Sequence, residues 1–197
     1  MITHISFDTE TWGKRAGFDM RSLGAVVFNP ETGELGEEFY QAVENPRTSP
    51  WNGFFDDIDT YRKYDLKRDP QTVEWWAEQS EEAQAAFANP IDLRDGLDRF
   101  YVWLMQVTGV DLVEKCDDLR IWSHGAAFDL PITEAACYAT QTCVPWFYRA
   151  PRDTRTLFEH VGMHPHKCLE EFATGTYHHA LDDAKTQAKA IIHAMNL

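Results

Sequence analysis

Two short stretches near opposite ends of the chain decide which fold and chemistry to expect: Phe7-Asp8-Thr9-Glu10-Thr11 and His178-His179-Ala180-Leu181-Asp182-Asp183. Between them lies Ala127-Phe128-Asp129-Leu130. Packing of a globular domain gives no reason to place carboxylates inside apolar stretches at three distant points. A shared site in which these carboxylates hold divalent cations explains all three stretches, and it predicts metal-assisted hydrolysis, with a phosphodiester as the expected substrate.

The first acidic pair ends a stretch, residues 2–8, whose apolar and polar residues alternate as in a β-strand. Asp8 and Glu10 are two residues apart, so on an extended strand they point to the same face and can ligate one cation or a close pair. Oxygen ligands of this kind suit Mg²⁺ or Mn²⁺. Acidic residues are also common where a strand simply enters a loop, so this pair needs support from the rest of the chain.

Asp129 follows a predicted strand and a turn of small residues, and it stands where a helix is expected to begin. Such turns place side chains over the end of a sheet, where sites of α/β proteins form. Aspartate is equally typical of a helix N-cap, and taken alone that second interpretation is the better one.

The last predicted helix spans residues 180–195, and its apolar face indicates which aspartate of the third motif points toward the site. Its apolar stripe consists of Ala180, Ala184, Ala188, Ile191 and Met195. Asp183 lies about 100° from the centre of that stripe and Asp182 about 160° away, so we predict Asp183 as the ligand and expect Asp182 to face solvent. His178 precedes the helix, and its ordinary pKa of about 6.5 suits a general base, although spacing alone does not separate it from His179.

The remaining pattern predicts a mixed sheet. Strands at 21–28 and 37–43, joined by a turn at 29–33, would form an antiparallel meander with the first strand. The other elements expected are helices over 70–87 (with a break near Ser80), 90–108, 128–140 and 153–161, and short strands over 119–122 and 144–148. Strands followed by helix–strand alternation indicate one α/β domain over residues 1–197, with a long aromatic loop at 45–68 that closes over substrate or forms a dimer contact.

Amino-acid composition limits the classes of protein to which this chain can belong. The chain of 197 residues is 44% hydrophobic, enough for one well-filled core. No run approaches the ~18 apolar residues of a membrane span, and no signal segment is evident, so we expect a cytoplasmic protein without membrane contact. The four cysteines lack CxxC spacing and are expected to be free thiols. A net charge of −14 predicts weak, salt-sensitive capture of nucleic acid, because bound cations reverse the field only locally.

The three motifs, in this order, resemble those of the DEDDh branch of the DnaQ-like 3′–5′ exonucleases. The resemblance implies an RNase H-like fold and two divalent cations, Mg²⁺ or Mn²⁺. By match of position, it makes Asp8, Glu10, Asp129 and Asp183 the metal ligands. It also prefers His178 over His179 as the base, because alanine follows two residues later and aspartate five.

Further stretches are similar to the RNase AS-like group of bacterial and phage exonucleases: Thr72–Ala83, Arg152–Leu157 and the paired histidines. This resemblance favours RNA over DNA and a homodimer. The chain departs from many relatives at Ser123-His124-Gly125, where they carry asparagine.

We therefore expect a 3′–5′ exonuclease that releases nucleoside 5′-monophosphates from single-stranded RNA or DNA. The resemblance places Thr11 at the terminal nucleotide. Trp12 is a candidate for packing against the sugar or base of that nucleotide, and His124 is a further candidate contact. Trp75 and Trp76 are adjacent on a predicted helix, so both cannot be core, and one is a candidate for stacking on a base. Two alternatives stay open: hydrolysis of short oligonucleotides or dinucleotides, and a non-catalytic nucleic-acid-binding domain, which would need a damaged site.

Overall fold

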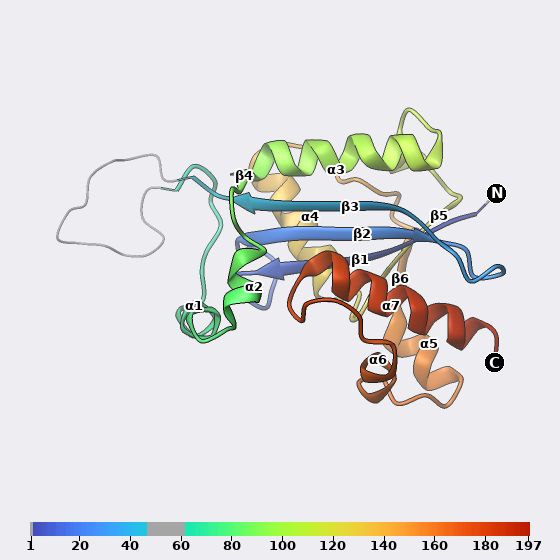
Figure 1. The fold of residues 1–197 in the computed structure, drawn as a ribbon. Coiled ribbons are helices and arrows are strands. Elements are labelled where there is room, and N and C mark those ends of the chain that lie inside the picture. The colour runs from blue at the N-terminus through green and yellow to red at the C-terminus, as the bar shows by residue number, and fades with distance from the viewer. Residues whose placement is uncertain (1, 47–61) are drawn as a thin grey trace.

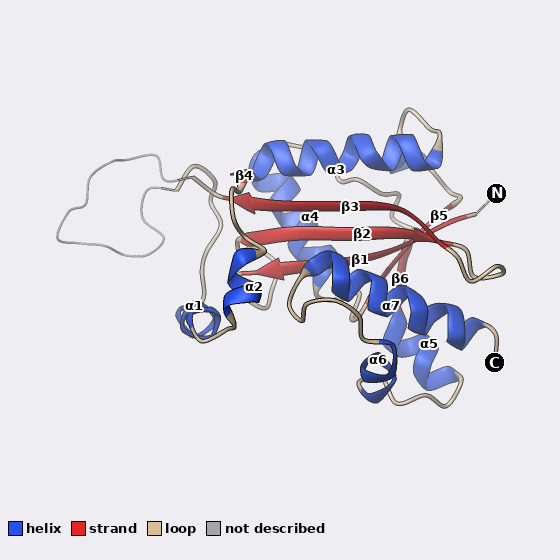
Figure 2. Ribbon diagram, in the orientation of Figure 1, coloured by secondary structure: helices blue, strands red, loops and turns tan. Residues whose placement is uncertain are grey.

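The computed structural model describes residues 2–46 and 62–197. Its centre is a six-stranded sheet in the order β4-β3-β2-β1-β5-β6, with helices packed on both faces (Figures 1 and 2). The mixed α/β sheet expected from the sequence is confirmed. Most of the aromatic loop predicted at 45–68 lies outside the described residues.

The predicted meander is present as β1 (Thr3–Thr11), β2 (Met20–Phe28) and β3 (Leu35–Glu44), each antiparallel to the next. The turn between β2 and β3 forms because the Asn29 side chain accepts hydrogen bonds from the Glu31 and Thr32 amides. The remaining strands all pair in parallel: β5 (Leu119–Ser123) with β1, β6 (Pro151–Asp153) with β5, and β4 (Ile91–Asp92) with β3.

Most helices follow the predicted periodicity with some differences in their bounds, whereas the helix at Lys167–Phe172 was not predicted. The helices are α1 (Pro70–Ala77), α2 (Glu81–Ala85), α3 (Leu93–Thr108), α4 (Asp129–Thr140), α5 (Thr154–His160), α6 (Lys167–Phe172) and α7 (Ala180–Met195), with a 3-10 turn at Val113–Lys115. The predicted break near Ser80 is confirmed, because the Ser80 side chain caps α2. In the described part of the chain no helix has the length and hydropathy needed to span a membrane.

Two sequence-based expectations, one about a strand and one about the start of a helix, are wrong. Residues 144–148 form no strand, because Trp146 is buried against Phe7 and bonded to Glu134 while β6 occupies the free edge of β5. The helix predicted from residue 90 begins only at Leu93, because Ile91–Asp92 first pairs with β3. All four cysteines are free thiols, as expected.

Alternation along the strands creates a core on each face of the sheet. Ile5, Phe7 and Leu23 point toward α3 and α4, where Phe7 stacks on Phe100 at a centroid distance of 5.0 Å. Val26 and Phe28 belong to a second core, which α5, α6 and α7 complete. The strands β1, β2 and β5 are therefore mostly buried, whereas β3 is exposed over Gly36–Glu38.

The start of α7 lies directly on β2. A Cβ atom built on Gly24 would lie 2.2 Å from the carbonyl carbon of Ala180 and from the amide nitrogen of Leu181. Gly24 is also the register partner of Asp8 on β1. The absence of a side chain at Gly24 thus lets α7 approach the end of β1 that carries the first acidic pair.

Candidate active site

Four buried or partly buried carboxylates from three elements meet near the end of β1. Asp8 and Glu10 come from β1, Asp129 is the first residue of α4, and Asp183 is in the first turn of α7. Burial raises the pKa of Asp8 well above its ordinary value, and the charges of Asp129, Asp183 and Glu10 raise it further. Four carboxylates from three distant parts of the sequence are thus close enough to repel one another.

The same cluster has the donor atoms of a cation site. One ligand atom from each of Glu10, His178 and Asp183 lies within 4.8 Å of the other two. Burial raises the pKa of both Asp129 and Asp183 to about 7. Hard oxygen donors that repel each other in a buried position are what a divalent cation would stabilise, so these residues fit the metal that the sequence motifs imply.

Hydrogen bonds hold two of the carboxylates in place. Oδ1 of Asp129 accepts from the Thr9 amide at 3.1 Å and from the Thr9 hydroxyl at 2.9 Å. Oδ1 of Asp8 accepts from Nε2 of Gln187 at 2.8 Å. The alternative of Asp129 as a helix N-cap does not apply, because Phe128 occupies the cap position and makes no capping hydrogen bond. Both carboxylates are therefore oriented by neighbours before any ligand arrives.

The structure separates the two histidines that spacing could not. His178 has a positive φ of 63°, and a nitrogen of its ring lies within 4.8 Å of carboxylate oxygens of Glu10 and Asp183. Its ring meets that of Trp75 edge to face at a centroid distance of 4.9 Å. Burial lowers the pKa of His178. His179 instead caps α7 and stacks on Tyr40 at a centroid distance of 4.2 Å.

Asp182 does not face solvent as predicted. Its side chain is 24% exposed, and its carboxylate accepts a hydrogen bond from the Thr176 amide at 2.8 Å. The reason is that the segment before α7 folds back over the first turn of the helix, and helical angles do not include this contact with residues outside the helix. Asp182 thus holds the segment before α7 against the first turn of the helix.

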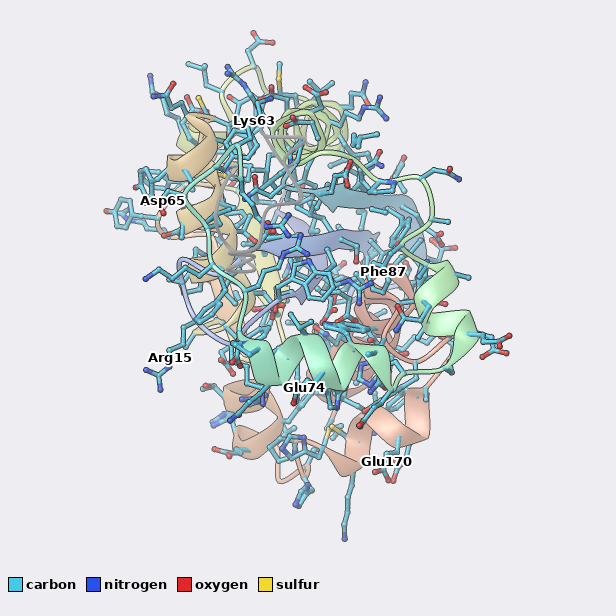
Figure 3. All side chains as sticks on the ribbon, turned by 90° about the vertical axis from the view of Figure 1, so that its left-hand side faces the viewer. Arg15, Lys63, Asp65, Glu74, Phe87 and Glu170 are labelled. Carbon is cyan, nitrogen blue, oxygen red and sulfur yellow. The ribbon has the colours of Figure 1, made fainter. Side chains whose placement is uncertain are left out.

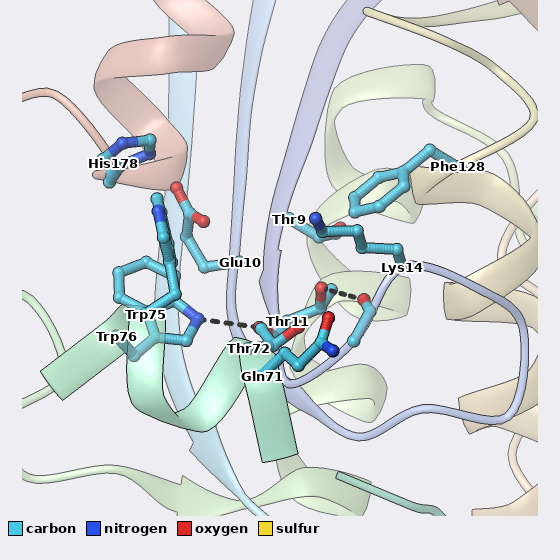
Figure 4. A pocket seen from close by; sticks show the side chains of 11 residues that line it. Thr9, Glu10, Thr11, Lys14, Gln71, Thr72, Trp75, Trp76, Phe128 and His178 are labelled. Carbon is cyan, nitrogen blue, oxygen red and sulfur yellow. Dashed lines mark hydrogen bonds between the residues drawn. The ribbon is translucent and has the colours of Figure 1, made fainter. Parts of the chain in front are cut away.

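Two cavities meet at the acidic cluster. The first, of about 580 Å³, is lined by residues of β1, the loop after it, α1, and the entries to α4 and α7: Thr9, Glu10, Thr11, Gly13, Lys14, Gln71, Thr72, Trp75, Trp76, Phe128 and His178 (Figure 4). The second, of about 640 Å³, includes Asp8, Asp129 and Asp183 and extends toward α5 and α6. Thr9, Glu10, Phe128 and His178 line both, so the cluster lies between them. Figure 3 views this end of the molecule, with α1 and its Glu74 in front and Glu170 of α6 below.

The predicted substrate residues divide into two groups. Thr11, Trp75 and Trp76 line the first cavity, and His124 lines the second. Trp12 lines neither, because its ring lies between the guanidinium groups of Arg21 and Arg68, each 4.3 Å from the ring centroid. The expectation that Trp12 packs on the terminal nucleotide is therefore not supported by its position.

The adjacent tryptophans have different environments, as the helical angle predicted. Trp75 is 41% exposed, whereas Trp76 is 2% exposed and donates through Nε1 to the Thr11 carbonyl oxygen at 2.8 Å (Figure 4). Trp76 thus fixes α1 to the end of β1, and Trp75 presents its ring to the cavity.

Sequence reasoning missed several residues that shape the site. Gln187 is four residues after Asp183 and so shares its helix face, a signal that would have identified it. Arg21 is a charged residue within the apolar strand β2, and a buried charge requires partners. It stacks on Trp76 at 4.3 Å, and its charge partly offsets the rise in the pKa of Glu10 that burial and the neighbouring aspartates cause. Only the fold shows that Thr9 holds Asp129.

Residues 3–195 match the family model described as "3'-5' exoribonuclease Rv2179c-like domain". The chain belongs to this Rv2179c-like family. A comparison with curated protein sequences gives no match.

Solved structures similar to this Rv2179c-like domain are also nucleases. The nuclease domain of 3'hExo, a DEDDh family member bound to rAMP, has a TM-score of 0.56 and 16% identity over 98% of this chain and 92% of that one. Exonuclease X, in complex with 5' overhanging duplex DNA, has a TM-score of 0.56 and 17% identity over 100% and 92%. E. coli Exonuclease I, in complex with a dT13 oligonucleotide, has a TM-score of 0.64 and 14% identity, and the match covers 98% of this chain but 41% of that one. At such identities the likeness shows a shared fold.

The Rv2179c-like domain is accordingly a 3′–5′ exonuclease with the RNase H-like fold of DEDDh nucleases. The sequence-based expectation for fold and enzyme class is confirmed. Membership in this 3′–5′ exonuclease family, together with the fold shared with DEDDh nucleases, also implies dependence on divalent metal.

Proposed function

We propose that this Rv2179c-like domain trims single-stranded nucleic acid from the 3′ end, RNA in preference to DNA, and releases nucleoside 5′-monophosphates. The observation that carries this proposal is the convergence of Glu10, His178 and Asp183, with ligand atoms within 4.8 Å of one another, at the junction of two cavities. The description of the family as exoribonuclease supports the preference for RNA.

Four carboxylates would hold the metal: Asp8, Glu10, Asp129 and Asp183. We propose two divalent cations, Mg²⁺ or Mn²⁺, which when bound supply Lewis-acid activation of water and of the phosphodiester and stabilise the leaving 3′ oxygen. Gln187 already donates a hydrogen bond to Asp8, and Thr9 already donates to Asp129. These two carboxylates therefore lose little conformational freedom when the metal binds.

His178 is the base in this proposal. Burial lowers the pKa of its imidazole, so the ring is neutral near pH 7 and can accept a proton from the attacking water. A nitrogen of the ring lies within 4.8 Å of carboxylate oxygens of Glu10 and Asp183, and the contact with Trp75 limits the rotation of the ring. His179 is committed to capping α7 and is not available for this role.

The terminal nucleoside would occupy the aromatic cavity beside α1. A volume of about 580 Å³ suits a ligand of this size. Trp75 offers a stacking surface for the base, and base–aromatic stacking tolerates all four bases. Thr11 and Phe128 line the same cavity near the acidic cluster. The bond to be cleaved would then lie at the four carboxylates.

Digestion of 5′-labelled single-stranded RNA and the matching DNA tests the proposal, with Mg²⁺, Mn²⁺ or EDTA in parallel. We expect a metal-dependent ladder that shortens from the 3′ end, faster on RNA, and its loss in Asp8→Ala. Asp95→Ala, which removes an exposed carboxylate in the first turn of α3, is the matched control and should cleave normally. Absence of cleavage of both polymers with either metal would refute the trimming of polymers.

A further inference from the structure

The second cavity has a wall that plays no part in the proposed chemistry. Besides Asp8, Asp129 and Asp183, the cavity of about 640 Å³ is lined by Arg155 and His166. Arg155 belongs to the first turn of α5, and His166 immediately precedes α6. Exposed basic groups at this place are notable in a chain with a net charge of −14.

The Arg155 guanidinium has no partner among the described residues. It is exposed and makes neither a hydrogen bond nor an ion pair with residues 2–46 or 62–197. It lies against the backbone of Gly125, where a Cβ atom would come 3.1 Å from its Nη1 atom. Gly125 thus leaves the space that lets the guanidinium lie beside the site.

The position of Arg155 does not stabilise its own helix. A positive charge in the first turn of a helix is unfavourable, because the helix dipole is positive at that end. Its charge instead reaches the site: it partly offsets the rise in the pKa of Asp129 that burial causes, and it adds to the lowering of the pKa of His124 by burial. An arginine with free donors at the edge of a nuclease cavity is suited to bind phosphate in a bidentate manner.

Two histidines extend this wall. The rings of His124 and His166 meet edge to face at a centroid distance of 5.6 Å. Nδ1 of His124 is 2.9 Å from the Thr154 hydroxyl, and burial, with the charges of Arg155 and His166, lowers the pKa of His124 to about 4. His124 is therefore neutral, and Arg155 is the permanent cation of the wall. Glu170 also lines this cavity, so an anion is favoured at Arg155 rather than along the whole wall.

We infer that Arg155, with His166 beside it, binds the phosphate on the 5′ side of the penultimate nucleotide. This inference rests on the proposed function, which places the terminal nucleoside in the aromatic cavity and the bond to be cleaved at the carboxylates. The preceding nucleotide then enters the second cavity and brings its own 5′ phosphate toward Arg155. That phosphate is a diester in a polymer and a monoester in a 5′-phosphorylated dinucleotide, so both substrate lengths present the same group.

The test compares ApA with pApA, two dinucleotides that differ only in this phosphate. For the unmodified protein we expect the phosphate to lower KM about tenfold or more, as a charge-assisted contact does. In Arg155→Ala this advantage should disappear, while KM for ApA stays within about twofold. Arg155→Lys should keep part of the advantage, because it retains the charge without the bidentate geometry. Arg94→Ala removes an exposed arginine from α3 and should keep the full advantage.

A third substrate separates the inference from the function on which it rests. The p-nitrophenyl ester of a nucleoside 5′-monophosphate has no penultimate nucleotide, so its hydrolysis reports only the acidic centre and should be unchanged in Arg155→Ala and Arg155→Gln. If the 5′ phosphate gives no advantage, or if Arg155→Ala raises KM equally for ApA and pApA, the inference is refuted while the function stands. If the unmodified protein cleaves none of the dinucleotides, the ester and the labelled polymers, the proposed function fails and the inference fails with it. If it trims only the polymers, the inference is refuted by an unchanged KM of Arg155→Ala for the labelled RNA.

Discussion

Gly24 and Ala180 pack backbone against backbone, and this contact sets the distance between the two halves of the acidic centre. Gly24 lies opposite Asp8 in the β1–β2 register. Ala180 begins α7, the helix that carries Asp183. A Cβ on Gly24 would lie 2.2 Å from the carbonyl carbon of Ala180, so no side chain fits between the strand and the helix.

Replacement of Gly24 should therefore disturb the acidic centre by displacing the helix that carries Asp183. In Gly24→Ala the added methyl group must push α7 away from β2 and so move Asp183 and His178 from β1. We expect loss of most nuclease activity and a decrease of about 1–3 kcal/mol in the free energy of unfolding, measured by urea denaturation. Gly36→Ala on β3 is the control, because its Cβ would lie 3.4 Å from the nearest atom, in Val27. Full activity of a folded Gly24→Ala would contradict the prediction.

Gln187 should act on the reaction through Asp8. Its Nε2 donates to Asp8 Oδ1 at 2.8 Å, and the residue is 3% exposed. In Gln187→Leu we expect kcat/KM to fall about 10–100-fold and the Mg²⁺ concentration for half-maximal rate to rise, because the carboxylate loses its orienting partner. Lys189→Ala on the same helix should change neither value. A variant whose Mg²⁺ dependence is unaltered would show that Asp8 needs no such support.

Removal of metal should make stability depend on pH. Burial raises the pKa of Asp129 and Asp183 to about 7, above the ordinary aspartate value of about 3.9. The folded protein then binds more protons than the unfolded chain, so in EDTA the free energy of unfolding decreases as the pH rises from about 4 through about 7. Mg²⁺ should raise Tm strongly at pH 8 and weakly at pH 5. Thermal unfolding at both values, with Mg²⁺ or EDTA, measures this difference.

A neutral substitution in the cluster should separate stability from activity. Asp129→Asn keeps an oxygen that can accept from Thr9 but removes one of the four repelling charges. We expect Tm in EDTA at pH 8 to rise by a few degrees, about 1 kcal/mol, while the nuclease activity is lost. Asp95→Asn, exposed on α3, should change neither property. A fall in Tm for Asp129→Asn would contradict the repulsion described above.

The two adjacent tryptophans should respond in opposite ways. Trp75 is 41% exposed in the cavity wall, so Trp75→Ala should raise KM about 5–100-fold with little change in Tm. Trp75→Phe should recover part of the binding. Trp76 is 2% exposed, and Trp76→Ala should decrease the free energy of unfolding by about 3–5 kcal/mol. Equal effects of the two alanine variants on KM and Tm would refute this division.

Local periodicity made much of the fold and the acidic set predictable. The alternation that ends at Asp8 and Glu10 required a strand with both carboxylates on one face, and the stripe of α7 selected Asp183 over Asp182. The break at Ser80 followed in the same way from a capping residue. Each of these inferences uses only residues of a single strand or helix, within which backbone geometry alone determines the direction of a side chain.

The sequence by itself determined the mixed sheet, the acidic motifs and the resemblance to DEDDh exonucleases, because strand and helix periods are local. The tertiary structure alone decided that His178 faces the carboxylates while His179 caps α7, that Trp12 lies between two guanidinium groups, and that Arg155 reaches the second cavity. These placements depend on contacts between residues far apart in the chain. They are set by packing such as that of Ala180 on Gly24, which no local pattern contains.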